Sequence, residues 1–169
     1  MPISPIHHVS LVSSIFHNKI NSLMNSTPVH IPIEIIELET QSFHLLVKCT
    51  INGEQQGEMV IDTGASKTVF DKNFVSNYQL KNQDKDDLQS CGLGGEDIVS
   101  DLVEIESLGF GDFISEKLNV VLIDLDQINN MYEKHCQRQI CGLLGSDFLL
   151  QNSAIIDYQK SILILSKNP

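Results

Sequence analysis

Apolar and polar residues alternate along the chain from position 30 onward, which is the pattern of a β-strand with one buried face. The apolar positions of the first two alternating runs are Ile31, Ile33 and Ile35, followed by Phe43, Leu45, Val47, Cys49 and Ile51. Asn52-Gly53 then supplies a residue pair that strongly favours a tight β-hairpin. The chain is expected to return as a strand through Glu58 to Ile61, so that Asp62 stands at a strand end. These patterns predict a domain built mainly from short β-strands.

The second half of the chain repeats this pattern. Residues 98–108 and 116–125 are rich in β-forming residues and are separated by Gly109-Phe110-Gly111-Asp112, which predicts a long hairpin. Further expected elements are a short helix or helical turn over 67–78, a helix over 126–138, and strands over 154–158 and 161–165. Many short strands with few helices indicate a closed or folded-over β domain.

The first 29 residues carry a different pattern. Their apolar residues recur at steps of three and four, which is the spacing of one helical face; they are Val9, Val12, Phe16, Ile20 and Leu23. This spacing predicts an amphipathic helix that packs on its own domain or dimer, although such a helix could also bind a partner or a membrane surface. Because 169 residues is a one-domain length, we expect an N-terminal helical extension over 1–29 and a single β domain over 30–169.

The composition of the chain bears on which partners and which cellular compartment are expected. Eleven Lys and Arg residues stand against 22 Asp and Glu residues, and the resulting net charge of −11 argues against nucleic acid as a partner. No apolar stretch approaches the length of a membrane span. The four cysteines, at positions 49, 91, 136 and 141, form no Cys-x-x-Cys pair, which favours reduced structural thiols. A soluble, cytoplasmic protein is the expectation from these features.

The segment Asp62-Thr63-Gly64-Ala65-Ser66 follows the apolar run Met59-Val60-Ile61 directly. Gly64 can adopt backbone angles that other residues avoid, so such a turn can hold a carboxylate at a rigid bend. A bare Asp-Thr-Gly could also be an ordinary turn. No rival catalytic set is visible: the six histidines lack metal-site spacing, Ser66 lacks a nucleophile-elbow context, and no Gly-rich loop ends in Gly-Lys-Ser or Gly-Lys-Thr. Neither a metal nor a cofactor is therefore expected.

Two further glycine-containing segments lie downstream. Cys91-Gly92-Leu93-Gly94-Gly95 precedes a β run, and by itself such a segment is usually a turn. Leu143-Leu144-Gly145-Ser146-Asp147-Phe148-Leu149 is by itself compatible with an ordinary strand-to-helix junction in which Ser146 or Asp147 caps the helix.

In this order the three segments resemble the active-site architecture of the retropepsins, the aspartic peptidases of retroviral type. The resemblance covers roughly residues 31–165 and implies a mainly β, single-lobe acid-protease domain that is closed and has short helices. It implies that Asp62 is catalytic and that Thr63, Gly64, Ala65 and Ser66 form its supporting loop. It also assigns Leu93, Gly94 and Gly95 to a flap that closes over substrate, and Leu144, Gly145 and Asp147 to a motif behind the site.

The loop at Asp62 occurs only once in the chain. Peptide hydrolysis by aspartates uses two carboxylates about 3 Å apart that share one proton. We therefore expect a C2 homodimer in which each subunit supplies one Asp62, acting on a peptide or protein substrate. The family resemblance places the dimer interface at the terminal strands, here residues 31–36 and 161–165. The alternative is a peptide-binding or assembly module that keeps the fold without turnover.

Two positions refine what the resemblance implies. Ala65 stands where pepsin-like enzymes commonly carry a hydroxyl residue that stabilises the ionised dyad, so activity is expected at mildly acidic to near-neutral pH. Ser66-Lys67 replace acidic residues that commonly follow the loop in viral members and grip the substrate backbone. The viral substrate contacts therefore do not transfer to this chain, and its specificity stays open.

Overall fold

The structure is a computed structural model that describes residues 27–75, 78–80 and 101–166. Its strands are β1 (Val29–Pro32), β2 (Glu34–Glu39), β3 (Ser42–Ile51), β4 (Gln55–Ile61), β5 (Val69–Asp71), β6 (Gln79–Leu80), β7 (Asp101–Phe110), β8 (Phe113–Ile123), β9 (Gly142–Leu144), β10 (Ile155–Asp157) and β11 (Ile162–Leu165), and its helices are α2 (Asp126–Cys136) and α3 (Ser146–Gln151). Neither of these two helices is long and apolar enough to cross a membrane. The expected N-terminal amphipathic helix lies outside the described residues.

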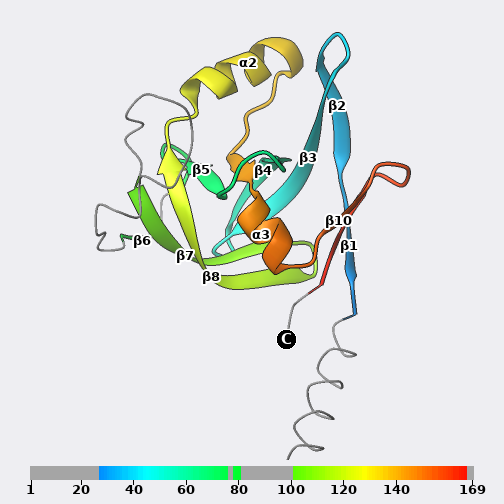
Figure 1. Ribbon diagram of the computed structural model, residues 1–169. Coiled ribbons are helices and arrows are strands. Elements are labelled where there is room, and N and C mark those ends of the chain that lie inside the picture. The colour runs from blue at the N-terminus through cyan, green and yellow to red at the C-terminus, as the bar shows by residue number, and fades with distance from the viewer. Residues whose placement is uncertain (1–26, 76–77, 81–100, 167–169) are drawn as a thin grey trace, which may run out of the picture.

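Eight strands form one sheet in the order β2-β3-β4-β9-β5-β8-β7-β6 (Figure 1). The long strand β3 pairs along its length with β2 and β4, and at its far end Thr50 and Ile51 pair with Gly109 and Leu108 of β7. This extra pairing closes the sheet on itself. The prediction of a mainly β, closed domain with few and short helices is thereby confirmed.

The interior of the closed sheet is filled by the alternating apolar residues. The central cluster includes Val47, Ile51, Phe70 and Ile105, all of them almost fully buried. Three aromatic rings complete it: Phe148 of α3 meets Phe110 and Phe113 edge to face, with ring centroids 5.5 and 6.3 Å apart. α3 is therefore held against the barrel interior by its buried face.

Both predicted hairpins are present. Asn52 and Gly53 have positive φ angles of 51° and 73°, and Glu54 N donates to Ile51 O at 3.1 Å, which is the primed-turn geometry that an Asn-Gly pair favours. The second hairpin joins β7 to β8 in a continuous antiparallel ladder whose last pair is Phe110 with Phe113. The predicted helix over 126–138 is confirmed as α2, and the last two predicted strands are confirmed as β10 and β11.

A short helix or helical turn was expected over residues 67–78, and this prediction was wrong for residues 69–71. These residues form strand β5, which lies inside the sheet, parallel to β8 and antiparallel to β9. All three residues of β5 are buried, so this strand lacks the polar alternation that marks a half-exposed strand. A helical turn follows it over residues 71–75, in which Phe74 N and Val75 N both donate to Asp71 O at 3.0 and 3.2 Å.

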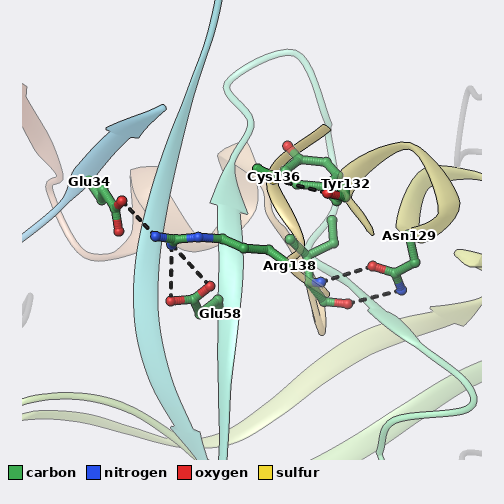
Figure 2. Close-up of polar contacts among 7 residues, drawn as sticks. Glu34, Glu58, Asn129, Tyr132, Cys136 and Arg138 are labelled. Carbon is green, nitrogen blue, oxygen red and sulfur yellow. Dashed lines mark hydrogen bonds and ion pairs between the residues drawn. The ribbon is translucent and has the colours of Figure 1, made fainter. Parts of the chain in front are cut away.

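Helix α2 is fastened across one end of the sheet by polar contacts near both of its ends (Figure 2). Asn129 clamps the backbone of Ile140, donating to its carbonyl at 3.1 Å and accepting from its N–H at 2.8 Å. Just beyond the helix, Arg138 donates to Glu34 of β2 at 2.6 Å and to Glu58 of β4 at 3.3 Å. These contacts fix α2 over the strands that lead to Asp62.

Tyr132, near the middle of α2, is almost fully buried, and its hydroxyl lies 2.5 Å from His44 Nδ1. Burial, and after it the nearby Cys136 and Asp62, raise the pKa of Tyr132 from 10.0 to about 12. Because the folded state holds the Tyr132 proton more tightly than the unfolded state does, the protonated hydroxyl favours folding. This contribution to the free energy of unfolding is fully present below pH 10 and is lost as the pH rises toward 12. Between pH 9 and pH 11 we expect the free energy of unfolding of wild type to fall by about 1 kcal/mol more than that of Tyr132→Phe, measured by urea unfolding. An equal fall in both proteins would contradict this assignment.

Candidate active site

Asp62 follows the last residue of β4, and its backbone N–H donates to Leu144 O at 3.0 Å. Its side-chain Oδ1 accepts hydrogen bonds from Gly64 N at 2.9 Å and from Ala65 N at 3.2 Å. A Cβ atom at position 64 would lie 3.2 Å from this oxygen, so glycine eases the close approach of the backbone to the carboxylate. Oδ2 accepts no hydrogen bond from any described residue. One carboxylate oxygen is thus held in place by the backbone of its own loop.

The loop that carries Asp62 crosses over the end of a neighbouring strand. Strand β9 lies between β4 and β5, parallel to the first and antiparallel to the second. Residues 62–68 connect β4 to β5 and must therefore pass over the end of β9, where Gly145 emerges. A Cβ on Gly145 would lie 2.5 Å from Lys67 O and 2.7 Å from Thr68 N, which are both backbone atoms. The absence of a side chain at Gly145 lets the two segments meet.

The first turn of α3 holds this loop from behind. Ser146 N donates to Ala65 O and Ser146 Oγ donates to Thr63 O, both at 2.8 Å. Asp147 Oδ1 accepts from both the N–H and the hydroxyl of Thr68, each at 2.8 Å. The Thr68 hydroxyl in turn accepts from Gly145 N at 3.1 Å. The side chains of Ser146 and Asp147 therefore bind the loop rather than only capping the helix.

The structure brings together most of the predicted site residues. Asp62, Gly64 and Ala65 share hydrogen bonds, and Leu144, Gly145 and Asp147 lie against the same loop. Thr63 and Ser66 also lie on it, with exposed side chains. The expected flap residues Leu93, Gly94 and Gly95 lie outside the described residues. The roles assigned to all of these residues remain predictions.

Thr68 is a part of the site that sequence reasoning missed. It is almost fully buried, and it connects the Asp62 loop to Asp147 through two hydrogen bonds. The available signal was a hydroxyl residue directly before the apolar pair Val69-Phe70. A buried hydroxyl needs a hydrogen-bond partner, and here that partner stands 79 positions away.

No cluster of three or more His, Cys, Asp or Glu side chains that could hold a metal ion occurs within the described ranges. The described cysteines Cys49, Cys136 and Cys141 are free thiols, and a hydrogen bond with Cys49, together with burial, raises the pKa of Cys141. A raised pKa keeps this thiol protonated and poorly nucleophilic. The two carboxylates of the described site differ in their contacts: Asp147 Oδ1 accepts from Thr68 N, the Thr68 hydroxyl and Phe148 N, whereas Asp62 Oδ1 accepts from two backbone N–H groups of its own loop.

A single closed β lobe, in which an Asp-Thr-Gly loop crosses over a glycine-containing strand end, has the architecture of an aspartic protease. Residues 47–148 match the sequence profile of the aspartyl protease family, and the chain belongs to this family. The prediction of a retropepsin-like aspartic peptidase is confirmed at the level of family and fold class.

The chain is similar to several solved structures, including the following two. One is a retropepsin-like aspartic protease from Rickettsia conorii, at 19% identity and a TM-score of 0.47, covering 86% of this chain and 98% of that chain. The other is the retroviral protease-like domain of Ddi1 from Leishmania major, at 16% identity and a TM-score of 0.41, covering 76% of this chain and 93% of that chain. No curated protein matches the chain significantly.

Proposed function

We propose that this protein is a homodimeric aspartic endopeptidase whose catalytic dyad consists of Asp62 from each of two subunits. The observation that carries the proposal is a single Asp-Thr-Gly loop in the chain, whose Asp62 is held through Oδ1 by two backbone N–H groups. In this proposal residues 30–169 form the protease domain and residues 1–29 a separate N-terminal extension.

The dyad works as a coupled acid and base. Two carboxylates about 3 Å apart share one proton, because both cannot be ionised at that distance. The ionised Asp62 takes a proton from a water molecule held between the two subunits, and this water attacks the scissile carbonyl. The protonated Asp62 of the other subunit hydrogen-bonds the carbonyl oxygen and then helps to protonate the leaving amine. The reaction written in this way requires neither a metal nor a cofactor.

The rest of the loop serves this arrangement. Thr63 is exposed at the loop, so its hydroxyl can reach the loop of a second subunit and lock the two together. Gly64 is also exposed and presents backbone groups to substrate. Leu144, Gly145 and Asp147 hold the loop from behind, while Leu93, Gly94 and Gly95 act as the flap over an extended peptide. The peptide binds as an added strand.

Ala65 sets the pH range in this proposal. Its methyl group donates no hydrogen bond to the dyad, so peptide cleavage by wild type is expected to be fastest at mildly acidic to near-neutral pH. Ala65→Thr adds a donor that stabilises the ionised dyad, and its pH profile is expected to move toward lower pH. The measurement is kcat/KM for one peptide in both proteins from about pH 2 to pH 8. A wild-type maximum near pH 2 would contradict the expectation.

Cleavage of a mixed peptide library by wild type and Asp62→Asn, each sized in solution, tests the proposed function. A dimer that binds peptides without cutting any would instead identify a peptide-binding module. We place the enzyme in a reducing compartment such as the cytoplasm, a proposal supported by the free thiols of Cys49, Cys136 and Cys141.

A further inference from the structure

Ser146, the first residue of α3, reaches the Asp62 loop with two separate donors. Its backbone N–H donates to Ala65 O and its hydroxyl Oγ donates to Thr63 O, both at 2.8 Å. The backbone bond is open to any residue except proline, which lacks the N–H. The hydroxyl bond depends on the side chain, and it joins residues that are 83 positions apart. The presence of serine at position 146 therefore bears on the Thr63 carbonyl.

The Thr63 carbonyl belongs to the same peptide group as the N–H of Gly64. A trans peptide group is planar, so its C=O and its N–H point in opposite directions. The described residues contain no cis peptide bond. On one side Thr63 O accepts from Ser146 Oγ at 2.8 Å, and on the other side Gly64 N donates to Asp62 Oδ1 at 2.9 Å. A single rigid plane thus connects the Ser146 hydroxyl with the Asp62 carboxylate.

This peptide group is the middle one of a β-turn. Ala65 N donates to Asp62 O at 3.2 Å, which places Thr63 and Gly64 at the two central positions of the turn. Type I and type II turns differ by a rotation of the middle peptide group through about 180°, and type II requires a positive φ at the second central residue. Gly64 has no positive φ. The turn is therefore in the orientation in which the Gly64 N–H faces Asp62.

The residues of the turn do not by themselves fix this orientation. Glycine adopts a positive φ without steric cost, so Gly64 permits the rotated form as well. Rotation would turn the Gly64 N–H away from Asp62 Oδ1, and of its two donors this oxygen would keep Ala65 N, at the longer distance of 3.2 Å. The same rotation would break the bond between Thr63 O and the Ser146 hydroxyl. The Ser146 hydroxyl therefore opposes the rotation.

We propose that Ser146 is a positioning residue of the Asp62 site, whose hydroxyl holds the Thr63–Gly64 peptide group in the orientation that directs the Gly64 N–H at the carboxylate. A hydrogen bond accepted by the carbonyl also polarises the peptide group, which strengthens its N–H as a donor. Ser146 acts through this peptide group and not on the substrate. Its link to catalysis rests on the proposed function, whereas its hold on the peptide group does not.

The test uses two pairs of side chains at position 146 that differ in the hydroxyl. Wild type and Ser146→Thr keep the hydroxyl, whereas Ser146→Ala and Ser146→Val lack it. All four proteins keep the backbone N–H that donates to Ala65 O, so the loop stays attached to α3. Ser115→Ala is the control, since Ser115 is half-buried as Ser146 is but lies on β8. Circular dichroism and urea unfolding check that each variant is folded.

Hydrogen exchange of the Gly64 amide, measured by NMR, reports on the peptide group directly. We expect this exchange to be ~10-fold faster in Ser146→Ala and Ser146→Val than in wild type, because the N–H is no longer held against the carboxylate. Steady-state cleavage of a defined peptide measures the consequence. Loss of the hydroxyl is expected to lower kcat by ~10-fold with KM unchanged, since the positioning of reacting groups acts in the chemical step. Ser146→Thr and Ser115→Ala should match wild type in both measurements.

The outcomes separate the role of Ser146 from the proposed function. Faster exchange and lower kcat in both variants without the hydroxyl, with Ser146→Thr like wild type, support the proposal. Unchanged exchange of the Gly64 amide in folded Ser146→Ala and Ser146→Val overturns it, whatever their activity. Faster exchange with unchanged kcat also overturns it, because the hydroxyl would then hold the loop without serving the reaction. Faster exchange in these variants, beside a wild type that cleaves no peptide, supports the hold on the peptide group and contradicts the proposed enzyme.

Discussion

Asp62→Asn is expected to lower kcat/KM for peptide cleavage by ~10⁴-fold or more, because both members of the dyad lose the group that accepts and donates the proton. The amide oxygen of Asn can still accept the hydrogen bonds that Gly64 N and Ala65 N donate to Oδ1 at 2.9 and 3.2 Å. The loop should therefore keep its conformation, and the variant should fold and dimerise. Cleavage of a defined peptide and sedimentation equilibrium are the two measurements.

Asp112→Asn is the matched control, since Asp112 is an exposed carboxylate in the turn between β7 and β8. It makes the same change of charge and should cleave as wild type does. Unchanged cleavage by Asp62→Asn would show that Asp62 is not the catalytic group.

Adding Asp62→Asn to wild type tests whether each subunit supplies half of the site. If subunits exchange freely, an equal amount of the variant should lower the activity of a fixed amount of wild type to about half, because mixed dimers hold a single carboxylate. If each chain acted alone, added variant would leave the activity of wild type unchanged.

Gly145→Ala is expected to destabilise the domain by ~3 kcal/mol or more, the upper part of the usual range for overpacking. The added Cβ would lie 2.5 Å from Lys67 O and 2.7 Å from Thr68 N. Both are backbone atoms, so no side-chain rotation relieves the overlap. Separating the loop from β9 would also weaken the bonds that Ser146 and Asp147 make to it, and cleavage should fall with stability.

Gly109→Ala is the control for this prediction. Gly109 is also buried, but a Cβ there would meet its nearest atom, Thr50 O, at 3.6 Å, an ordinary contact distance. Urea unfolding of both variants and of wild type gives the free energies. A Gly145→Ala protein as stable as Gly109→Ala would show that the loop and β9 are less tightly packed than the structure indicates.

The sequence predicted correctly those elements whose signals are local. The alternation around β3 and β4, the Asn52-Gly53 turn and the position of Asp62 at the end of β4 depend on residues that are close together in the chain. Period-two patterning and turn chemistry act over a few residues, so they can be recognised without knowledge of the fold. The same local motif at Asp62 led to the aspartyl protease family, which the match over residues 47–148 confirms.

Features that depend on distant partners could not be obtained in this way. β5 was taken for part of a short helix or helical turn because both of its faces are buried by residues from distant parts of the chain. Phe70 lies in the central cluster, and Val69 packs on the other face with Val121 and Leu125, more than fifty positions later. The role of Thr68 became visible only through Asp147, which stands 79 positions later. Similarly, strand β11 pairs with β1 on one edge and with β10 on the other, and this order of strands in the sheet cannot be read from the residues of β11.

The sequence alone therefore determined the family and the residue on which the proposed function depends: Asp62, in a short turn that holds its carboxylate. The tertiary structure decided how the Asp62 loop is supported and which apolar side chains near it are exposed. Strand β11 is paired on both edges, with the distant strand β1 and with the neighbouring strand β10, whereas Leu150 of α3 and Ile155 of β10 stay exposed. Such pairings depend on which strand edges remain free after the others have paired, and no local residue pattern records that.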